Sequence, residues 1–184
     1  MLACPASVPG SLSMIFCKGV TMDITLGAFE ILTMAEQIER DSVDFYRRAA
    51  SRVANDELRS LFSQLADWER KHEEIFGVMK RDVTEKSDNS MIFDEASYVT
   101  SNPQRLHSLA KSAVKNSPEQ ELSQVRNKLE VLDLALKREA DAIRFFRALH
   151  KYALDAATKA KIKAIIEEEK KHVSILTQAL QQSQ

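Results

Sequence analysis

Hydrophobic residues recur at steps of three and four over most of the chain, which is the spacing of one face of an α-helix. This pattern predicts a first helix from about Leu26 to Val53 and a second that ends near Val83. A third helix is expected from Pro118 to about Ala153, and a last helix ends near Gln182. The chain is therefore expected to be all-α, with four long helices.

Residues suited to begin helices stand before three of these segments. Asn55 or Asp56 is expected to cap the second helix, and Asp155 the last one. Ser117 and Gln120 have the spacing of a capping box, and Pro118 between them occupies the first helical position. Each pair of helices is joined by a short connection, which predicts two antiparallel helical hairpins.

The remaining segments interrupt the helical pattern. Residues 84–117 contain Ser87-Asp88-Asn89-Ser90 and Asn102-Pro103, so we interpret them as a long crossover between the hairpins, in which Gln104 to Val114 could form a short helix. Residues 1–21 contain Pro, Ser and Gly without a helical pattern, and we expect a disordered tail. Because a second Met stands at position 22, this tail could be an upstream extension. One domain is then expected over residues 22–184.

A shift of 100 residues aligns the two predicted hairpins. In each helix one stripe, expected to face the core, combines apolar residues with one or two polar ones. The first and third helices contribute Leu32, Ala35, Glu39, Ser42, Tyr46 and Leu132, Ala135, Glu139, Ala142, Phe146. The second and fourth contribute Phe62, Leu65, Glu69, His72, Phe76 and Ile162, Ile165, Glu169, His172, Leu176. Two hairpins related by approximate twofold symmetry would bring the four stripes together.

The polar members of these stripes predict a metal site. Glu69 precedes His72 by three residues and Glu169 precedes His172 by three, so each pair lies on one face of its helix. One Glu from each of two helices and a Glu-x-x-His from each of the other two form the ligand set of ferritin-like di-iron and di-manganese bundles. The predicted ligands are Glu39, Glu69, His72, Glu139, Glu169 and His172.

Charge favours the same interpretation. Any single glutamate is usually solvated, but four unpartnered carboxylates in a core would each cost several kcal/mol, on the order of the whole stability of a domain. Two divalent cations would cancel their charge of −4. Carboxylate and imidazole ligands favour iron or manganese, and zinc or copper could bind as substitutes. We expect two iron ions, which suit a redox reaction.

Composition excludes several other classes of protein. The chain has 184 residues and a net charge of −1 with interspersed acidic and basic residues, so neither nucleic acid nor an anionic membrane is an expected partner. No apolar run approaches the roughly 20 residues of a membrane span, and no charged export signal is present. We therefore expect a cytoplasmic protein. The two cysteines, Cys4 and Cys17, cannot form a Cys-x-x-Cys iron site.

The motifs AEQIERDSVDFY, LADWERKHEEIF, ALKREADAIRFF and IIEEEKKHVSIL resemble those of the rubrerythrin-like branch of the ferritin-like superfamily, over about Asp23 to Leu180. The resemblance implies a ferritin-like four-helix bundle in which Glu69 and Glu169 bridge two irons. Rubrerythrins often add a rubredoxin domain that supplies electrons, which this chain lacks, so an external donor such as a rubredoxin-like protein is expected. They also have another Glu one turn after the third-helix ligand, where this chain has Ala142. The six-ligand set is in this respect closer to that of bacterioferritin.

The resemblance favours an enzyme that reduces hydrogen peroxide, or dioxygen, at the di-iron site. Oxidation of ferrous iron for transfer or storage is the alternative, and a manganese catalase or a structural metal site is a minor one. By family analogy we expect a homodimer.

Other residues near the predicted site have simpler interpretations. Tyr46 is either a core tyrosine or a hydrogen-bond donor to a ligand carboxylate. Trp68, Phe45 and Phe145 are expected to serve packing alone, and His150 to lie at a helix end. Solvent exposure is expected for His107, Glu73, Glu74, Glu167 and Glu168.

Overall fold

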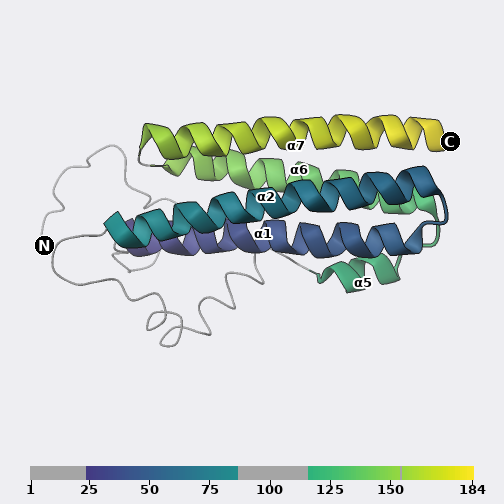
Figure 1. Cartoon of the computed structure of the whole chain (residues 1–184), viewed down its shortest axis with the longest axis horizontal. Coiled ribbons are helices and arrows are strands. Elements are labelled where there is room, and N and C mark those ends of the chain that lie inside the picture. Colours follow the sequence, from purple (N-terminus) through teal and green to yellow (C-terminus); the bar gives the residue numbers. More distant parts are fainter. Residues whose placement is uncertain (1–23, 87–115, 154) are drawn as a thin grey trace, which may run out of the picture.

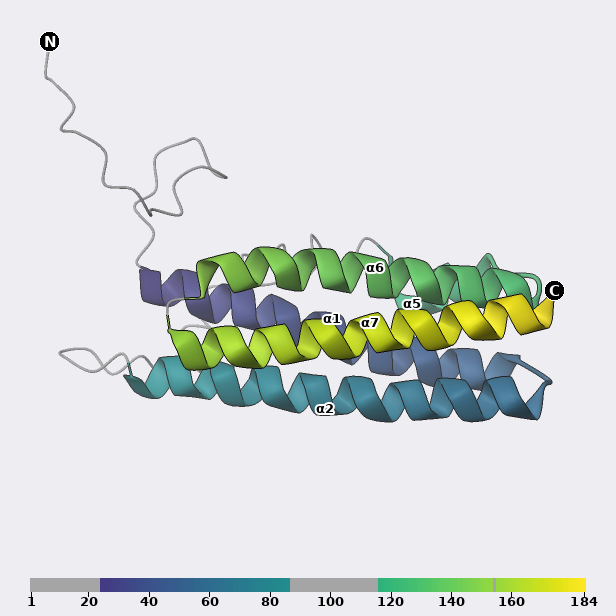
Figure 2. The ribbon, with the colours of Figure 1, turned by 90° about the horizontal axis from the view of Figure 1, so that it is seen from above.

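The structure is a computed structural model that describes residues 24–86, 116–153 and 155–184. Its described elements are helices: α1 (Ile24–Arg52), α2 (Asp56–Lys86), α5 (Pro118–Ser123), α6 (Lys128–Tyr152) and α7 (Ala156–Ser183). The four long helices lie side by side as two antiparallel hairpins, α1 with α2 and α6 with α7 (Figures 1 and 2). The predicted all-α bundle of two hairpins is confirmed. The predicted tail of residues 1–21, most of the predicted crossover and His107 lie outside the described residues.

Capping side chains fix where these helices begin. Asn55 Oδ1 accepts a hydrogen bond from the Leu58 amide at 2.8 Å, and Asp155 caps α7 through the Thr158 amide. The capping box of Ser117 and Gln120 is present, with both reciprocal hydrogen bonds. The helix starts predicted from cap chemistry at these three places are therefore confirmed.

The prediction of one continuous helix from Pro118 to about Ala153 is wrong. The chain leaves helical geometry after Ser123, and α6 begins only at Lys128, where Asn127 accepts hydrogen bonds from two backbone amides. The short α5 packs against α1, and its Leu122 is fully buried in the core. Burial of Leu122 and the cap at Asn127 together favour a break that helical periodicity alone does not show.

The core consists of two apolar clusters at different levels of the bundle. One contains Tyr46, Phe62 and Leu132, and the other contains Leu32, Phe76 and Phe146. Every residue of the four predicted stripes is buried. The polar stripe residues lie between the two clusters in sequence, so the fold places carboxylates and imidazoles in the middle of an apolar core.

Candidate metal centre

Four helices bring the six predicted ligands to one place. Glu39 lies on α1, Glu69 and His72 on α2, Glu139 on α6, and Glu169 and His172 on α7. All six are at most 3% exposed. Helical spacing places each of them on the inner face, because each continues a stripe whose other members are apolar.

The six residues form two overlapping groups. Glu39, Glu69, His72 and Glu169 offer ligand atoms that lie within 4.8 Å of one another, and Glu69, Glu139, Glu169 and His172 do the same. Two glutamates, one from each hairpin, belong to both groups. The arrangement therefore offers two adjacent candidate metal positions that share two carboxylates.

Each histidine faces the glutamate of the opposite hairpin. His72 Nδ1 lies 2.8 Å from Glu169 Oε1, and His172 Nδ1 lies 3.0 Å from Glu69 Oε1. The two imidazole rings are nearly parallel, with centroids 5.7 Å apart. Both Nδ1 atoms thus point into the space between the helices, where the shared carboxylates are.

The donor atoms at this site are better suited to bind metal ions than to form hydrogen bonds with one another. Both carboxylate oxygens of Glu39 are buried without a hydrogen-bond partner, as are Glu69 Oε1, His72 Nδ1 and Glu169 Oε1. A buried polar atom without a partner typically costs about 1–3 kcal/mol, so five in one cluster would be strongly destabilising. Hard oxygen and imidazole donors are ligands for iron or manganese, and two divalent ions would satisfy these atoms and balance four carboxylates.

Without metal ions, bound protons balance part of the negative charge of the cluster. Burial, together with the nearby charges of Glu69 and Glu169, raises the pKa of Glu39 well above its usual value. Burial and the charge of Glu169 raise the pKa of Glu139 to about 8. Burial alone would lower the pKa of His72, but its contacts with Glu169 and Glu69 raise it to about 10. Positive charge is therefore favoured at the centre of the cluster.

His172 follows the same logic. Burial opposes its protonation, yet contacts with Glu139, Glu169 and Glu69 raise its pKa to about 12. The pKa of Glu169 is lowered even though burial and Glu69 act to raise it, because both imidazoles lie within 3.1 Å of its carboxylate oxygens.

Three further side chains contact the predicted ligands from outside. The Tyr46 hydroxyl donates a hydrogen bond to Glu139 Oε1, so of its two interpretations the structure shows the donor to a carboxylate. Glu168 Oε2 lies 3.0 Å from His72 Nε2. Trp68 stacks on His172, with ring centroids 5.2 Å apart and an angle of 7° between the planes.

Two of these contacts correct sequence-based expectations. Glu168 is half-exposed but is not merely solvated, because it pairs with His72 across the interface of α2 and α7. Trp68 does more than fill space, since its ring covers an imidazole of the site. Neither contact has a signal in the local sequence, because each joins residues about one hundred positions apart. His150 lies in the last turn of α6, as predicted.

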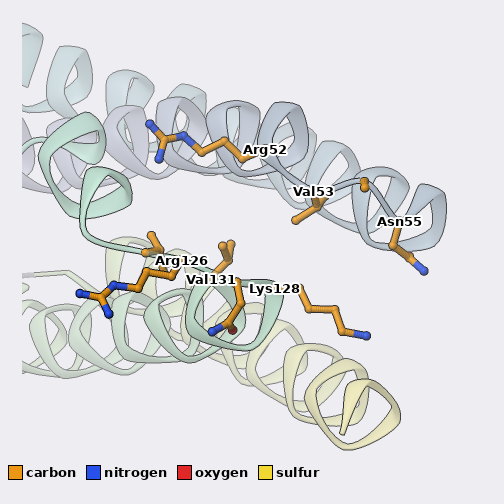
Figure 3. Close-up of a pocket in the computed structure, with 9 residues that line it drawn as sticks. Arg52, Val53, Asn55, Arg126, Lys128 and Val131 are labelled. Carbon is orange, nitrogen blue, oxygen red and sulfur yellow. The ribbon is translucent and has the colours of Figure 1, made fainter.

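Two surface cavities differ in their relation to this centre. One, of about 340 Å³, lies where the α1–α2 turn meets the start of α6 and is lined by Arg52, Val53 and Arg126 among others (Figure 3). It includes none of the predicted ligands. The second, of about 240 Å³, is a groove lined by Trp68, Glu168, Lys171, His172 and Ile175. His172 is the one predicted ligand among the residues that line this groove.

Comparison with known proteins agrees with this geometry. The family model described as Rubrerythrin matches residues 30–180, which include all six predicted ligands. The chain belongs to the rubrerythrin family. Rubrerythrins are di-iron proteins, and the buried cluster is the part of this chain suited to bind the iron.

A solved structure shares the fold. It is a crystal structure from Thermotoga maritima, described as a ferritin-like diiron-carboxylate protein, and it has 25% sequence identity to this chain. The similarity covers 89% of this chain and 97% of the other, with a TM-score of 0.63. A search of curated proteins gave no match. None of the described helices is long and apolar enough to cross a membrane.

Proposed function

We propose that this protein is a di-iron oxidoreductase that reduces hydrogen peroxide to water with electrons from an external donor. The observation that carries the proposal is the pair of ligand groups that share Glu69 and Glu169 in a buried core. When bound, two ferrous ions would supply one electron each, which is what reduction of one peroxide to two waters requires, together with two protons.

The protein's own residues would hold the irons and limit what reaches them. Glu39, Glu69 and His72 would bind one ion together with Glu169, and the second group would bind the other. Apolar clusters containing Phe62 and Phe76 exclude water on either side of the ligands in each helix. Such surroundings strengthen the interactions between the carboxylates and the cations.

Access for a small oxidant is best supported at the groove over His172. Glu168 and Lys171 at its surface are polar, whereas Trp68 and Ile175 are apolar, so it could admit a small uncharged molecule such as peroxide. Burial and the charge of Glu139 raise the pKa of Tyr46, so its hydroxyl keeps its proton and remains a hydrogen-bond donor beside the site.

We propose that a rubredoxin-like or flavin-linked protein restores the reduced state. We also propose a homodimer, by analogy with the family.

One observation favours oxidation of ferrous iron, for transfer or storage, as a second candidate function. The position one turn after Glu139 is Ala142, which is buried and offers no additional carboxylate. The predicted ligand set is therefore six residues, as in the bacterioferritin-like interpretation of the sequence.

The two functions differ in oxidant and in the fate of the iron. Protein loaded anaerobically with two ferrous ions per chain should be mixed with peroxide or with oxygen and followed by stopped-flow absorbance. Faster oxidation by peroxide, with both irons retained, supports the peroxidase; oxygen-driven turnover that releases or accumulates ferric iron supports iron handling. Glu69→Ala should abolish the reaction, while Glu74→Ala, at an exposed position on the same helix, should not change it.

A further inference from the structure

The two halves of the bundle match at the predicted ligands but not around them. With the shift of 100 residues, Glu168 of the second half corresponds to Trp68 of the first, and Tyr46 corresponds to Phe146. Each of these four residues lies in or beside the metal centre or the adjoining core. The two metal positions therefore have different surroundings although their ligand types are the same.

At the His72 position the imidazole is supported by a carboxylate. Nδ1 faces the shared glutamates, and Nε2 lies 3.0 Å from Glu168 Oε2. A carboxylate that accepts the Nε2 proton leaves Nδ1 with its lone pair free for a metal and makes the imidazole a stronger donor. It also adds negative charge close to the bound cation.

At the His172 position the corresponding support is an aromatic ring. Nδ1 lies 3.0 Å from Glu69 Oε1 and 3.1 Å from Glu169 Oε2, so it faces the centre just as Nδ1 of His72 does. The ring stacks on Trp68, which is uncharged and cannot accept a proton from Nε2. Stacking holds the plane of the imidazole but does not increase its basicity.

The two glutamates that belong to only one ligand group, Glu39 and Glu139, differ in the same direction. Glu139 has one oxygen engaged by the Tyr46 hydroxyl, whereas both oxygens of Glu39 lack hydrogen-bond partners. Phe146, the counterpart of Tyr46, packs on Phe76 with ring centroids 5.0 Å apart and has no hydroxyl to donate. Both oxygens of Glu39 are therefore available to a cation, whereas one oxygen of Glu139 is already engaged by a hydroxyl.

We propose that the two metal positions are inequivalent, and that Glu168 is a positioning residue that makes the His72 position the first to be filled. The inference rests on the metal centre of the proposed function but not on its peroxide chemistry. Loss of a carboxylate behind a ligand histidine typically weakens metal binding by about 10- to 100-fold. Because Glu168 is half-exposed, we expect the lower end of that range.

The order of filling can be measured directly. The full-length protein should be stripped of metal, loaded anaerobically with one equivalent of cobalt(II) and crystallised, and the occupancy of each position determined from anomalous scattering. We expect most of the metal beside His72. Equal occupancy, or a preference for the position beside His172, would overturn the proposal.

Variants test whether Glu168 is the cause. Glu168→Gln keeps an acceptor for His72 but removes the charge, and it should weaken the first binding step in calorimetry by about tenfold while the second step is unchanged. The control is Glu167→Gln, because the adjacent Glu167 pairs with Lys170 on the surface. An unchanged first step in Glu168→Gln, or the same loss in the control, would refute the role of Glu168.

These results are distinguishable from failure of the proposed function. If the wild-type protein binds fewer than two metal ions per chain even at saturation, the di-iron proposal itself fails. If it binds two ions with equal affinity, only the inequivalence fails.

Discussion

Replacing Glu139 by glutamine should stabilise the metal-free protein while weakening its metal binding. Burial and the charge of Glu169 raise the pKa of this carboxyl from 4.5 to about 8. The folded protein must therefore take up a proton that the unfolded chain does not hold at neutral pH. Glutamine is uncharged, has a similar shape, and can still accept the hydrogen bond from Tyr46, so it removes this penalty, while His172 keeps its closer contacts with Glu69 and Glu169.

The size and pH dependence of the effect follow from the pKa. Between pH 4.5 and about 7.5 the penalty accumulates at about 1.4 kcal/mol per unit, which gives about 4 kcal/mol at about pH 7.5 and only about 1 kcal/mol at about pH 5.5. Because the pKa of Glu139 is raised in the folded protein, the free energy of unfolding of the wild type falls as the pH rises from 4.5 to about 8. The stabilisation by Glu139→Gln grows over the same range.

The assay is urea unfolding with a metal chelator, at both pH values, for the wild type and Glu139→Gln. Asp141→Asn, which removes an exposed carboxylate from the same helix, is the matched control and should change the free energy of unfolding by less than about 0.5 kcal/mol. With saturating divalent metal the order should reverse, because the variant has lost a ligand. A metal-free variant no more stable than the wild type at about pH 7.5, or a gain that does not shrink at about pH 5.5, would refute the reasoning.

Three further predictions follow from the site. Glu69→Ala or Glu169→Ala should abolish binding of both ions, whereas Glu39→Ala should mainly lose one, because only Glu69 and Glu169 belong to both ligand groups. The metal content of each variant, measured by inductively coupled plasma analysis, checks this, and equal losses of metal in all three variants would contradict it. Tyr46→Phe should destabilise the metal-free protein by about 1–2 kcal/mol in chemical unfolding through loss of a buried hydrogen bond, and an unchanged midpoint would argue against that bond. Loading two divalent ions at about pH 7 should release at least two protons, because both histidines have pKa values well above 7 in the metal-free protein, and the raised pKa of Glu139 adds to the release. An indicator dye in weak buffer measures the release; fewer than two protons would be inconsistent with the raised pKa values.

Much of the fold could be predicted because its signals are local. Helical spacing identified the stripes of all four long helices, and every residue of those stripes is buried. Cap chemistry at Asn55, Ser117 and Asp155 located three helix starts. The break between Ser123 and Lys128 was not predicted, because helical periodicity continues through it and the burial of Leu122 against another helix favours it.

The same distinction applies to the site. The six candidate ligands were found from sequence because each interrupts an apolar stripe with a polar residue, and the structure brings them together. The contacts of Glu168 with His72 and of Trp68 with His172 join different helices, so no local pattern predicts them. These contacts determine how the two metal positions differ, and that difference could be seen only after the helices were packed.

The most direct test of a di-iron centre at these six residues is the iron content of protein reconstituted anaerobically and then desalted, compared with that of Glu69→Ala. We expect two irons per chain in the wild type and almost none in the variant, because Glu69 belongs to both ligand groups. Retention of less than one iron by the wild type, or two irons in the variant, would contradict the assignment.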